Sequence, residues 1–218
     1  MIGVTLANKD YMPMAVEAAE RFNKFTGLPF VIVRVNDKKP YMTKLRLHTM
    51  FNQTVVFFDA DLWFVKKCDL SQFNERKEFI GVKDILETND ESSCIFINDC
   101  RKHGINRSLY INTGFYIWNN RHKQILEEAS RLSEVLKVKD FGEQSYINIA
   151  LQRSGCDILH LDRRYNNFKH FELDNQKRKE FTSFAIHGTG EAGAKSKMGY
   201  LKTQSKKYER KQKYGMHL

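Results

Sequence analysis

The chain has 218 residues, a length suited to one domain with a sizeable core, and carries a formal charge of +10. That excess of positive charge indicates a polyanionic partner such as nucleic acid, anionic lipid or an acidic glycan. No apolar run reaches the roughly 20 residues of a membrane span, and residues 1–12 lack a signal-peptide pattern. We therefore expect no transmembrane segment and a cytoplasmic protein, in the host cytoplasm if it is viral. The cysteines, Cys68, Cys94, Cys100 and Cys156, have no zinc-like spacing. A pair between Cys94 and Cys100 is the alternative to the free thiols that we expect in a reducing compartment.

Apolar strands and amphipathic helices alternate along the chain. Strand-like runs occupy residues 2–6, 30–35 and 54–58, and helical patterns separate them at residues 13–27 and 41–51. Further strands are expected at residues 79–82, 109–118, 157–161 and 184–187, and helices at residues 124–136 and 143–152. This alternation predicts one α/β domain over residues 1–200, with a central, mostly parallel sheet flanked by helices. Residues 201–218 form a basic C-terminal tail that we expect to be loosely ordered.

The most informative segment is residues 54–64, TVVFFDADLWF, in which the pattern of a buried strand ends at two aspartates. Carboxylates in so apolar a segment are costly to desolvate unless a cation compensates them. Asp59 and Asp61 are two residues apart, so in an extended chain both side chains can reach one divalent ion. The carboxyl end of a strand is also where open α/β sheets bind ligands. The competing interpretation is that the two aspartates begin a solvated turn.

Four other segments accompany this one in order along the chain. They are TLANKDYMPMAVEA near the N-terminus, INTGFYIWNN from residue 111, GEQSYIN from residue 142 and HGTGEAGAK from residue 187. Together the five segments resemble the GT-A glycosyltransferases, most closely the retaining group that contains glycogenin and the lipopolysaccharide galactosyltransferases. The resemblance covers residues 1–200. It implies a single GT-A, Rossmann-like domain and a glycosyltransferase that uses a nucleotide sugar.

The resemblance also implies a donor site. Asp59, Asp61 and His187 would bind Mn²⁺ or Mg²⁺ and, through the ion, the diphosphate of a donor such as a UDP-sugar. From the sequence alone, His187 is also explained as a hydrogen-bonded histidine beside a turn. The positions implied to contact the donor are Ala7, Asn8, Tyr11, Lys44, Arg46, Asp59, Ala60, Asp61, Asn112, Gly114, His187, Gly190 and Lys195.

Several of these assignments keep an alternative. Either Lys44 or Arg46 would be the basic residue near the donor, and each also fits a surface cation on an amphipathic helix. Lys197 competes with Lys195 for the leaving diphosphate. Asn112 and Gly114 would line the donor sugar, since a glycine allows close backbone approach, but they also fit a β-bulge.

Glu143 and Gln144 match the pair that faces the transferred sugar in the resembled group, and they are the catalytic candidates. Gln144 would lie nearest the reacting carbon, with Glu143 second. Glu143 also fits an acid in the first turn of a helix, where the helix dipole favours it. An inverting enzyme needs a carboxylate base near the acceptor hydroxyl, whereas the resemblance favours retention of configuration.

The acceptor site is expected from residues 84–108, which are too long for an ordinary connector, and from the loop after Leu161. That loop interleaves cations with aromatic side chains, namely Arg163, Arg164, Tyr165, Phe168, Lys169, His170 and Phe171. With the basic tail, it fits a nucleic-acid acceptor such as hydroxymethylated DNA. It fits equally a glycan or lipid-linked saccharide approached from an anionic membrane surface.

Two other classes of protein compete with a glycosyltransferase. A non-catalytic nucleic-acid-binding α/β domain accounts for the charge but leaves the DAD, NTG and EQ segments without a role. A nucleotidyltransferase also uses paired carboxylates and a divalent ion. It usually has a glycine-rich basic loop after the first strand, and ANKDYMP is not such a loop.

Overall fold

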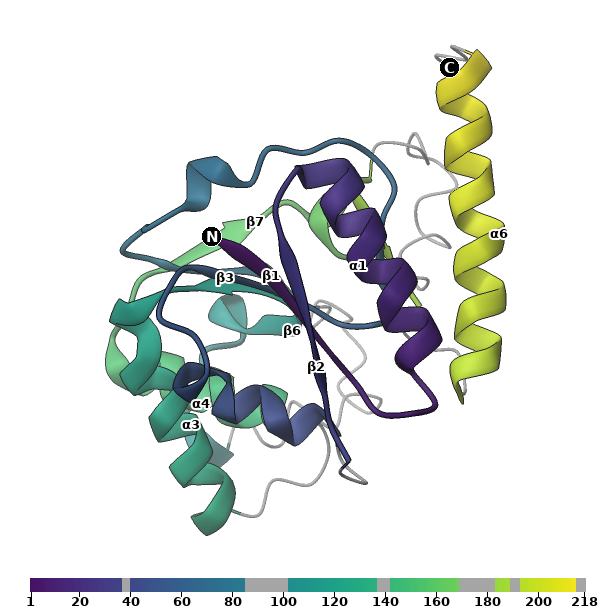
Figure 1. Cartoon of the computed structure of the whole chain (residues 1–218). Coiled ribbons are helices and arrows are strands. Elements are labelled where there is room, and N and C mark those ends of the chain that lie inside the picture. Colours follow the sequence, from purple (N-terminus) through teal and green to yellow (C-terminus); the bar gives the residue numbers. More distant parts are fainter. Residues whose placement is uncertain (37–39, 85–101, 137–141, 169–182, 189–192, 215–218) are drawn as a thin grey trace.

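The fold is given by a computed structural model, which describes residues 1–36, 40–84, 102–136, 142–168, 183–188 and 193–214 (Figure 1). Within these residues the main element is a six-stranded sheet. Across the sheet its strands are β2 (Phe30–Arg34), β1 (Ile2–Ala7), β3 (Val55–Phe58), β6 (Ile111–Trp118), β5 (Phe79–Lys83) and β7 (Ile158–Leu161). A three-stranded sheet lies beside it, in the order β4 (Leu62–Phe64), β9 (Ala185–His187) and β8 (Asn167–Phe168). The predicted α/β fold with a mostly parallel sheet is confirmed.

The α-helices are α1 (Met12–Thr26), α3 (Lys123–Val135), α4 (Glu143–Ser154) and α6 (Gly193–Tyr214). The 3₁₀ helices are η1 (Pro40–Thr49), which is long for its type, and the short η2 (Ser71–Phe73), η3 (Arg107–Leu109), η4 (Asn120–His122) and η5 (Arg163–Tyr165). Two α-helices end where a glycine takes a left-handed conformation that other residues rarely adopt, Gly27 after α1 and Gly155 after α4. No helix in the described part of the chain is long and apolar enough to cross a membrane.

One strand of the main sheet runs against the others. β6 is antiparallel to both β3 and β5, whereas β1 is parallel to β2 and β3, and β5 is parallel to β7. The carboxyl ends of β1, β3, β5 and β7 therefore meet the amino end of β6 at one edge of the sheet. We call this the ligand edge, because open α/β sheets bind ligands at the carboxyl ends of their strands.

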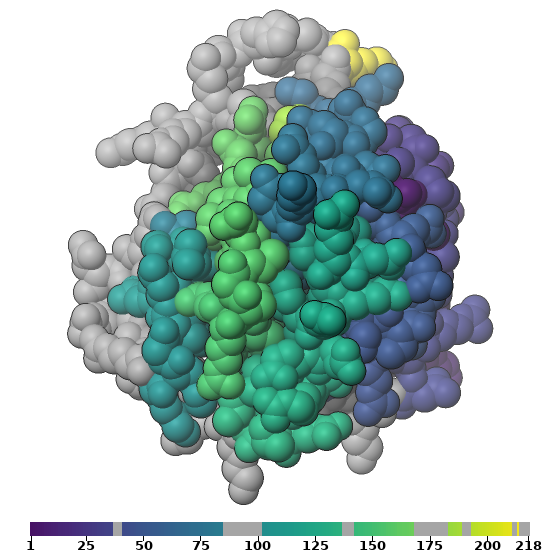
Figure 2. Space-filling model, turned by 90° about the vertical axis from the view of Figure 1, so that its left-hand side faces the viewer, coloured from purple at the N-terminus to yellow at the C-terminus, as the bar shows by residue number. Residues whose placement is uncertain are grey.

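The sheet has a hydrophobic core on each face. Val55 and Phe57 of β3 pack with η1, α3 and α4, and the alternate residues Val56 and Phe58 pack with α1, β4 and α6. All four side chains are buried, as the apolar pattern of residues 54–58 predicts. Figure 1 shows α1 and α6 on one side of the sheet and α3 and α4 on the other. Figure 2 views the molecule from the side that α3 and α4 cover, where they lie against each other.

Two segments differ from the predictions. Residues 41–51 were expected to form an α-helix, but residues 40–49 form the tighter helix η1, in which positions i and i+3 lie on the same side. Residues 201–218 were expected to be loosely ordered, but α6 continues to Tyr214. The reason is a stripe at helical spacing, because Leu201, Ser205 and Tyr208 are all buried against the body of the protein.

Candidate active site

Two aspartates and a histidine converge at the ligand edge. Asp59 and Asp61 lie in the turn between β3 and β4, where the Leu62 amide donates to the Asp59 carbonyl at 2.9 Å. His187 ends β9 and pairs with Leu62 of β4, which brings the imidazole beside the turn. One ligand atom from each of Asp59, Asp61 and His187 lies within 4.8 Å of the others. The strand pairing of β4 with β9 therefore assembles three residues that are far apart in the sequence.

The chemistry of this cluster fits a divalent cation. Two carboxylates and an imidazole are suitable ligands for Mn²⁺, and the carboxylates for Mg²⁺. Asp61 and His187 are buried, with 6% and 4% of their surfaces exposed, whereas Asp59 is half-buried. A bound ion would thus be enclosed on the protein side and open on the side of Asp59.

A lysine from α6 also contacts the cluster. The Lys197 ammonium donates to Oδ2 of Asp61, while Lys195 is exposed. Burial opposes ionisation of Asp61, but His187 and Lys197 outweigh it and hold the pKa of that carboxyl well below its usual value. Burial likewise disfavours the charged Lys197, yet Asp61 raises the pKa of the ammonium. Of the two lysines that the sequence left open, the structure brings Lys197 to the aspartates.

A second lysine joins the aspartates to α4. Lys44 is 4% exposed, and its ammonium lies 2.8 Å from Asp59 Oδ1, 2.7 Å from Glu143 Oε1 and 3.3 Å from the Thr113 carbonyl. Burial alone would lower the pKa of Lys44, but Asp59 and Glu143 raise it above its ordinary value. Arg46 is exposed. The structure therefore separates the two basic candidates, since η1 turns Lys44 inward and Arg46 outward.

The catalytic candidates lie at the amino end of α4, opposite the start of β6. Gln144 accepts from the Thr113 amide at 3.0 Å and donates to Asp84 at 2.7 Å. Burial raises the pKa of Glu143 above its usual value, and Lys44 offsets part of that rise. Both side chains of the pair are buried, so this end of the site is enclosed.

Asn112 and Gly114 stand at the start of β6, within a continuous strand with a register shift opposite Gly81 and Val82. The Gly114 amide donates to Asn112 Oδ1 at 2.9 Å. A Cβ atom at Gly114 would lie only 2.5 Å from Cε1 of His187, so the glycine allows the histidine its position.

The remaining predicted donor positions lie around the end of β1. Ala7 and Ala60 pack in one small cluster, with Tyr11 half-buried against it, so β1 meets the aspartate turn there. Asn8 caps the turn, because its Oδ1 accepts from the amides of Asp10 and Tyr11. Gly190 lies outside the described residues.

Part of the predicted acceptor region also lies outside the described residues, namely 85–101 and 169–182. Within the described part, Tyr165 was expected to face the acceptor, but its ring is not exposed to a ligand. The ring is buried and packs against Phe115 and Phe184, with a centroid distance of 4.8 Å to the latter. Arg164 lies over the Phe184 ring. Tyr165 is therefore a residue of the hydrophobic core.

Three residues that contact the predicted site residues were not among the predicted positions: Asp84, Thr113 and Asn166. Asp84 follows β5 as Asp59 follows β3, so the strand-end argument could have found it. Thr113 lies inside the recognised NTG segment. Asn166 is completely buried beside His187, and no sequence signal marks it.

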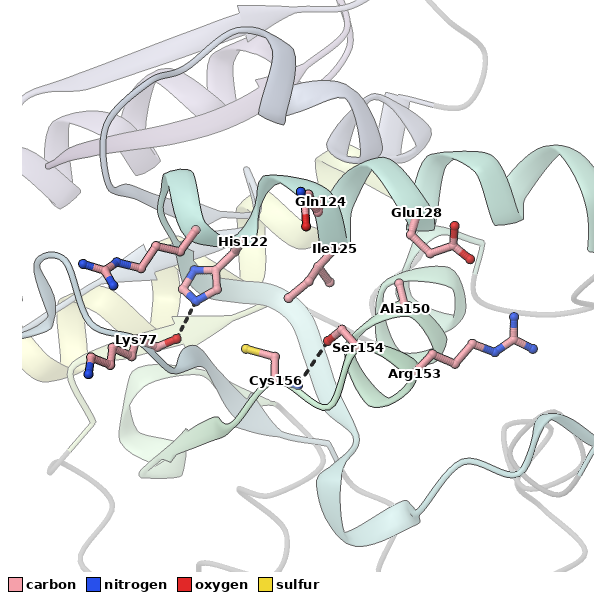
Figure 3. Close-up of a pocket in the computed structure, with 10 residues that line it drawn as sticks. Lys77, His122, Gln124, Ile125, Glu128, Ala150, Arg153, Ser154 and Cys156 are labelled. Atoms are coloured by element: carbon pink, nitrogen blue, oxygen red, sulfur yellow. Dashed lines mark hydrogen bonds between the residues drawn. The ribbon is translucent and has the colours of Figure 1, made fainter.

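A separate cavity of about 440 Å³ lies away from this cluster (Figure 3). It is lined by η4, the start of α3 and the end of α4, including Arg121, His122 and Arg153, and by Lys77 and Cys156. Because Lys77 and Cys156 precede β5 and β7, the cavity belongs to the edge of the sheet opposite the ligand edge. None of the predicted site residues that the structure describes lines it.

Comparison with known proteins identifies the fold. A scan against protein-family models and a search of curated proteins each found no match. Among solved structures, the galactosyltransferase LgtC in complex with donor and acceptor sugar analogs matches with a TM-score of 0.67 and 14% identity, covering 93% of this chain and 96% of LgtC. A glycosyltransferase involved in the glycosylation of the major capsid of PBCV-1 matches with a TM-score of 0.64 and 10% identity, covering 92% and 98%.

The bifunctional glycosyltransferase WbbM, in its apo form, matches with a TM-score of 0.68 and 12% identity, covering 95% of this chain but 51% of WbbM. The chain thus spans about half of WbbM and nearly all of the other two. At these identities the likeness establishes the fold, which is the GT-A fold of these glycosyltransferases. The fold that the sequence segments imply is confirmed.

Proposed function

We propose that this chain is a metal-dependent glycosyltransferase that moves a sugar from a nucleotide donor, a UDP-sugar, to an acceptor hydroxyl with retention of configuration. The observation that carries the proposal is the Asp59–Asp61–His187 cluster at the ligand edge of a GT-A fold. LgtC, which shares the fold, was solved with donor and acceptor sugar analogs. We propose the same pair of ligands, by class, for this chain.

Asp59, Asp61 and His187 would hold Mn²⁺ or Mg²⁺, which when bound would neutralise negative charge on the donor diphosphate. Lys197 adds a fixed positive charge at the same place, with Lys195 two residues away at the surface. Tyr11 and Asn8 would hold the nucleoside at the end of β1. The positive charges are oriented before the donor arrives, which favours the charge that develops on the departing diphosphate.

Asn112, Glu143 and Gln144 would surround the transferred sugar. Retention of configuration is supported by the burial and the hydrogen bonds of the Glu143 carboxylate. Glu143 is buried, and its Oε1 accepts from Lys44 and from Thr113, so it is not a carboxylate that faces an acceptor and awaits a proton. An inverting reaction needs such a base. Gln144, held at both ends of its amide, is the side chain we place nearest the reacting carbon.

The donor half of the proposal can be tested without knowing the acceptor. Release of nucleoside diphosphate is measured for a panel of nucleotide sugars with Mn²⁺, because many transferases hydrolyse their donor slowly. We expect turnover of one donor, its loss on chelation and at least a 100-fold loss in Asp61→Asn. Asp157→Asn, an exposed aspartate before β7, is the matched control and should keep full activity. If no donor is turned over or bound with metal, the proposed function is wrong.

For the acceptor we propose a polyanion, with hydroxymethylated DNA as the first candidate. The support is the outward face of α6. At 100° per residue, Lys195, Lys202, Lys206 and Lys213 fall within about 40° of one line, which runs for about 27 Å along the helix. The acid on this helix, Glu209, lies 3.3 Å from Arg21 of α1. A line of cations matches the phosphates of a nucleic acid, and Lys202 and Lys206 are exposed.

The acceptor half of the proposal is tested by measuring the affinity for fluorescent DNA at a series of salt concentrations. Each neutralised phosphate contributes about −0.9 to the slope of log K against log salt, so contacts by four lysines predict a slope near −3.6. Lys202→Glu with Lys206→Glu should lower affinity at least tenfold, whereas Glu127→Gln on α3 should not. Binding to phosphatidylserine vesicles but not to DNA would refute the nucleic-acid acceptor.

The free thiols of Cys68 and Cys156 fit the cytoplasmic location that we propose for the protein.

A further inference from the structure

A buried asparagine joins the metal-binding candidates to the sugar-binding candidates. Asn166 follows η5, and its exposed fraction is 0%. Its Oδ1 lies 2.8 Å from Nδ1 of His187, and its Nδ2 lies 2.9 Å from Oδ1 of Asn112. A fully buried amide needs a partner at each end, because an unmatched end would be costly.

Gly114, Asn112, Asn166 and His187 are linked by a series of hydrogen bonds, and one backbone group fixes the direction of each. The Gly114 amide can only donate, and it donates to Oδ1 of Asn112 at 2.9 Å. That oxygen is therefore an acceptor, so Asn166 must present its NH₂ group to it. The Asn166 oxygen then faces His187, and Nδ1 of His187 must carry the proton that it donates.

The state of the other nitrogen follows for the neutral ring, which is the form that ligates a metal. A neutral His187 with its proton on Nδ1 has a lone pair on Nε2, whereas without a metal a charged ring could donate from Nε2 to Asp61. Nε2 lies 3.2 Å from Oδ1 of Asp61 and 3.8 Å from Oδ2 of Asp59. In the neutral ring, three atoms that can only accept therefore face one another, an arrangement that a cation between them stabilises.

We infer that Asn166 is a positioning residue that holds His187 in the Nδ1–H form, so that its Nε2 lone pair is directed at the site of the metal. This inference rests on the proposed function for its metal and on hydrogen-bond geometry for the rest. Because the Asn166 amide also donates to Asn112, it links His187 to the segment that we assign to the donor sugar. Loss of Asn166 would let Nε2 take the proton and donate it to Asp61, which would remove a metal ligand.

The experiment compares three variants. Asn166→Ala removes both bonds, and Asn166→Asp keeps an acceptor for the Nδ1 proton but loses the donor to Asn112. Asn167→Ala is the matched control, because Asn167 is the next residue and its side chain donates instead to Ser183 at 2.8 Å. Circular dichroism and urea unfolding establish that each variant is folded.

The first measurement is the tautomer of His187, by long-range ¹H–¹⁵N spectra at pH 8 without metal. The protein has seven histidines, so the ring is assigned by its absence in His187→Gln. We expect the Nδ1–H form in the wild type, Asn167→Ala and Asn166→Asp, and a shift toward the Nε2–H form in Asn166→Ala. A merely structural asparagine would not move this signal.

The second measurement is Mn²⁺ affinity by electron paramagnetic resonance. Asn166→Ala should bind about 10- to 100-fold more weakly, as for other residues that orient a metal ligand, and Asn167→Ala should stay within threefold. A folded Asn166→Ala with the wild-type tautomer and wild-type Mn²⁺ affinity would overturn the inference. If the wild type itself binds no Mn²⁺, the proposed function fails, and the tautomer spectra still decide the role of Asn166. If Asn166→Ala does not fold, Asn166→Ser is measured in its place with the same expectation.

Discussion

Replacement of Lys44 by methionine tests whether the buried ammonium holds the site together. Methionine keeps most of the side-chain volume but removes the charge that lies between Asp59 and Glu143. Breaking a buried ion pair by removing one partner costs about 3–5 kcal/mol, because the other charge stays buried. Asp59 is half-buried and can be hydrated, so most of this cost arises at Glu143. We expect a loss of about 3 kcal/mol in the free energy of unfolding.

Urea denaturation monitored by tryptophan fluorescence measures this loss, since Trp63 and Trp118 are both buried and report on the core. Arg46→Met is the matched control, two residues away on the same helix, and should change stability by less than about 0.5 kcal/mol. Adding Glu143→Gln to Lys44→Met removes the unpaired charge and should restore at least about 1 kcal/mol. A Lys44→Met protein as stable as Arg46→Met would refute the reasoning.

Three further predictions concern other parts of the chain. Burial lowers the pKa of His122, whose Nε2 lies 2.9 Å from the Lys77 carbonyl, so the unfolded chain binds the proton more tightly. Stability should therefore fall as pH drops through about 6.5, and His122→Gln should flatten that slope in urea titrations at pH 5–7; an unchanged slope would contradict this. Gly114→Ala should weaken Mn²⁺ binding at least about tenfold in calorimetry, because the added Cβ would displace His187. Burial raises the pKa of the Cys68 thiol to about 12, so native Cys68 should react with iodoacetamide at least about 100-fold more slowly than in urea, as measured by mass spectrometry.

The fold and the centre of the site follow from local patterns. The run TVVFF predicts a strand buried on both faces, and β3 is such a strand. The two aspartates directly follow β3, and the carboxyl ends of the parallel strands all lie at the ligand edge, so the aspartates lie there too. Asp84 obeys the same rule, so a stricter use of strand ends would have added it to the site.

Other features depend on contacts that no local pattern encodes. Lys44 and Arg46 both carry a positive charge, and only the packing of η1 against the sheet determines which of them points inward. The choice of Lys197 over Lys195 depends on how α6 is rotated, which its buried face determines. Asn166 owes its role to β9, which brings His187 beside it from elsewhere in the chain.

The packing of α6 affects how deletion experiments should be interpreted. Lys197 lies in its first turns, whereas Leu201 and Tyr208, which hold the helix against the body, come later. Tyr208 is eleven residues, or about 16 Å, beyond Lys197. A protein shortened at residue 200 would still contain the lysine but would lack its support. Loss of activity in such a protein would not show that the removed segment touches the acceptor, so charge-reversal variants of the intact helix are the informative choice.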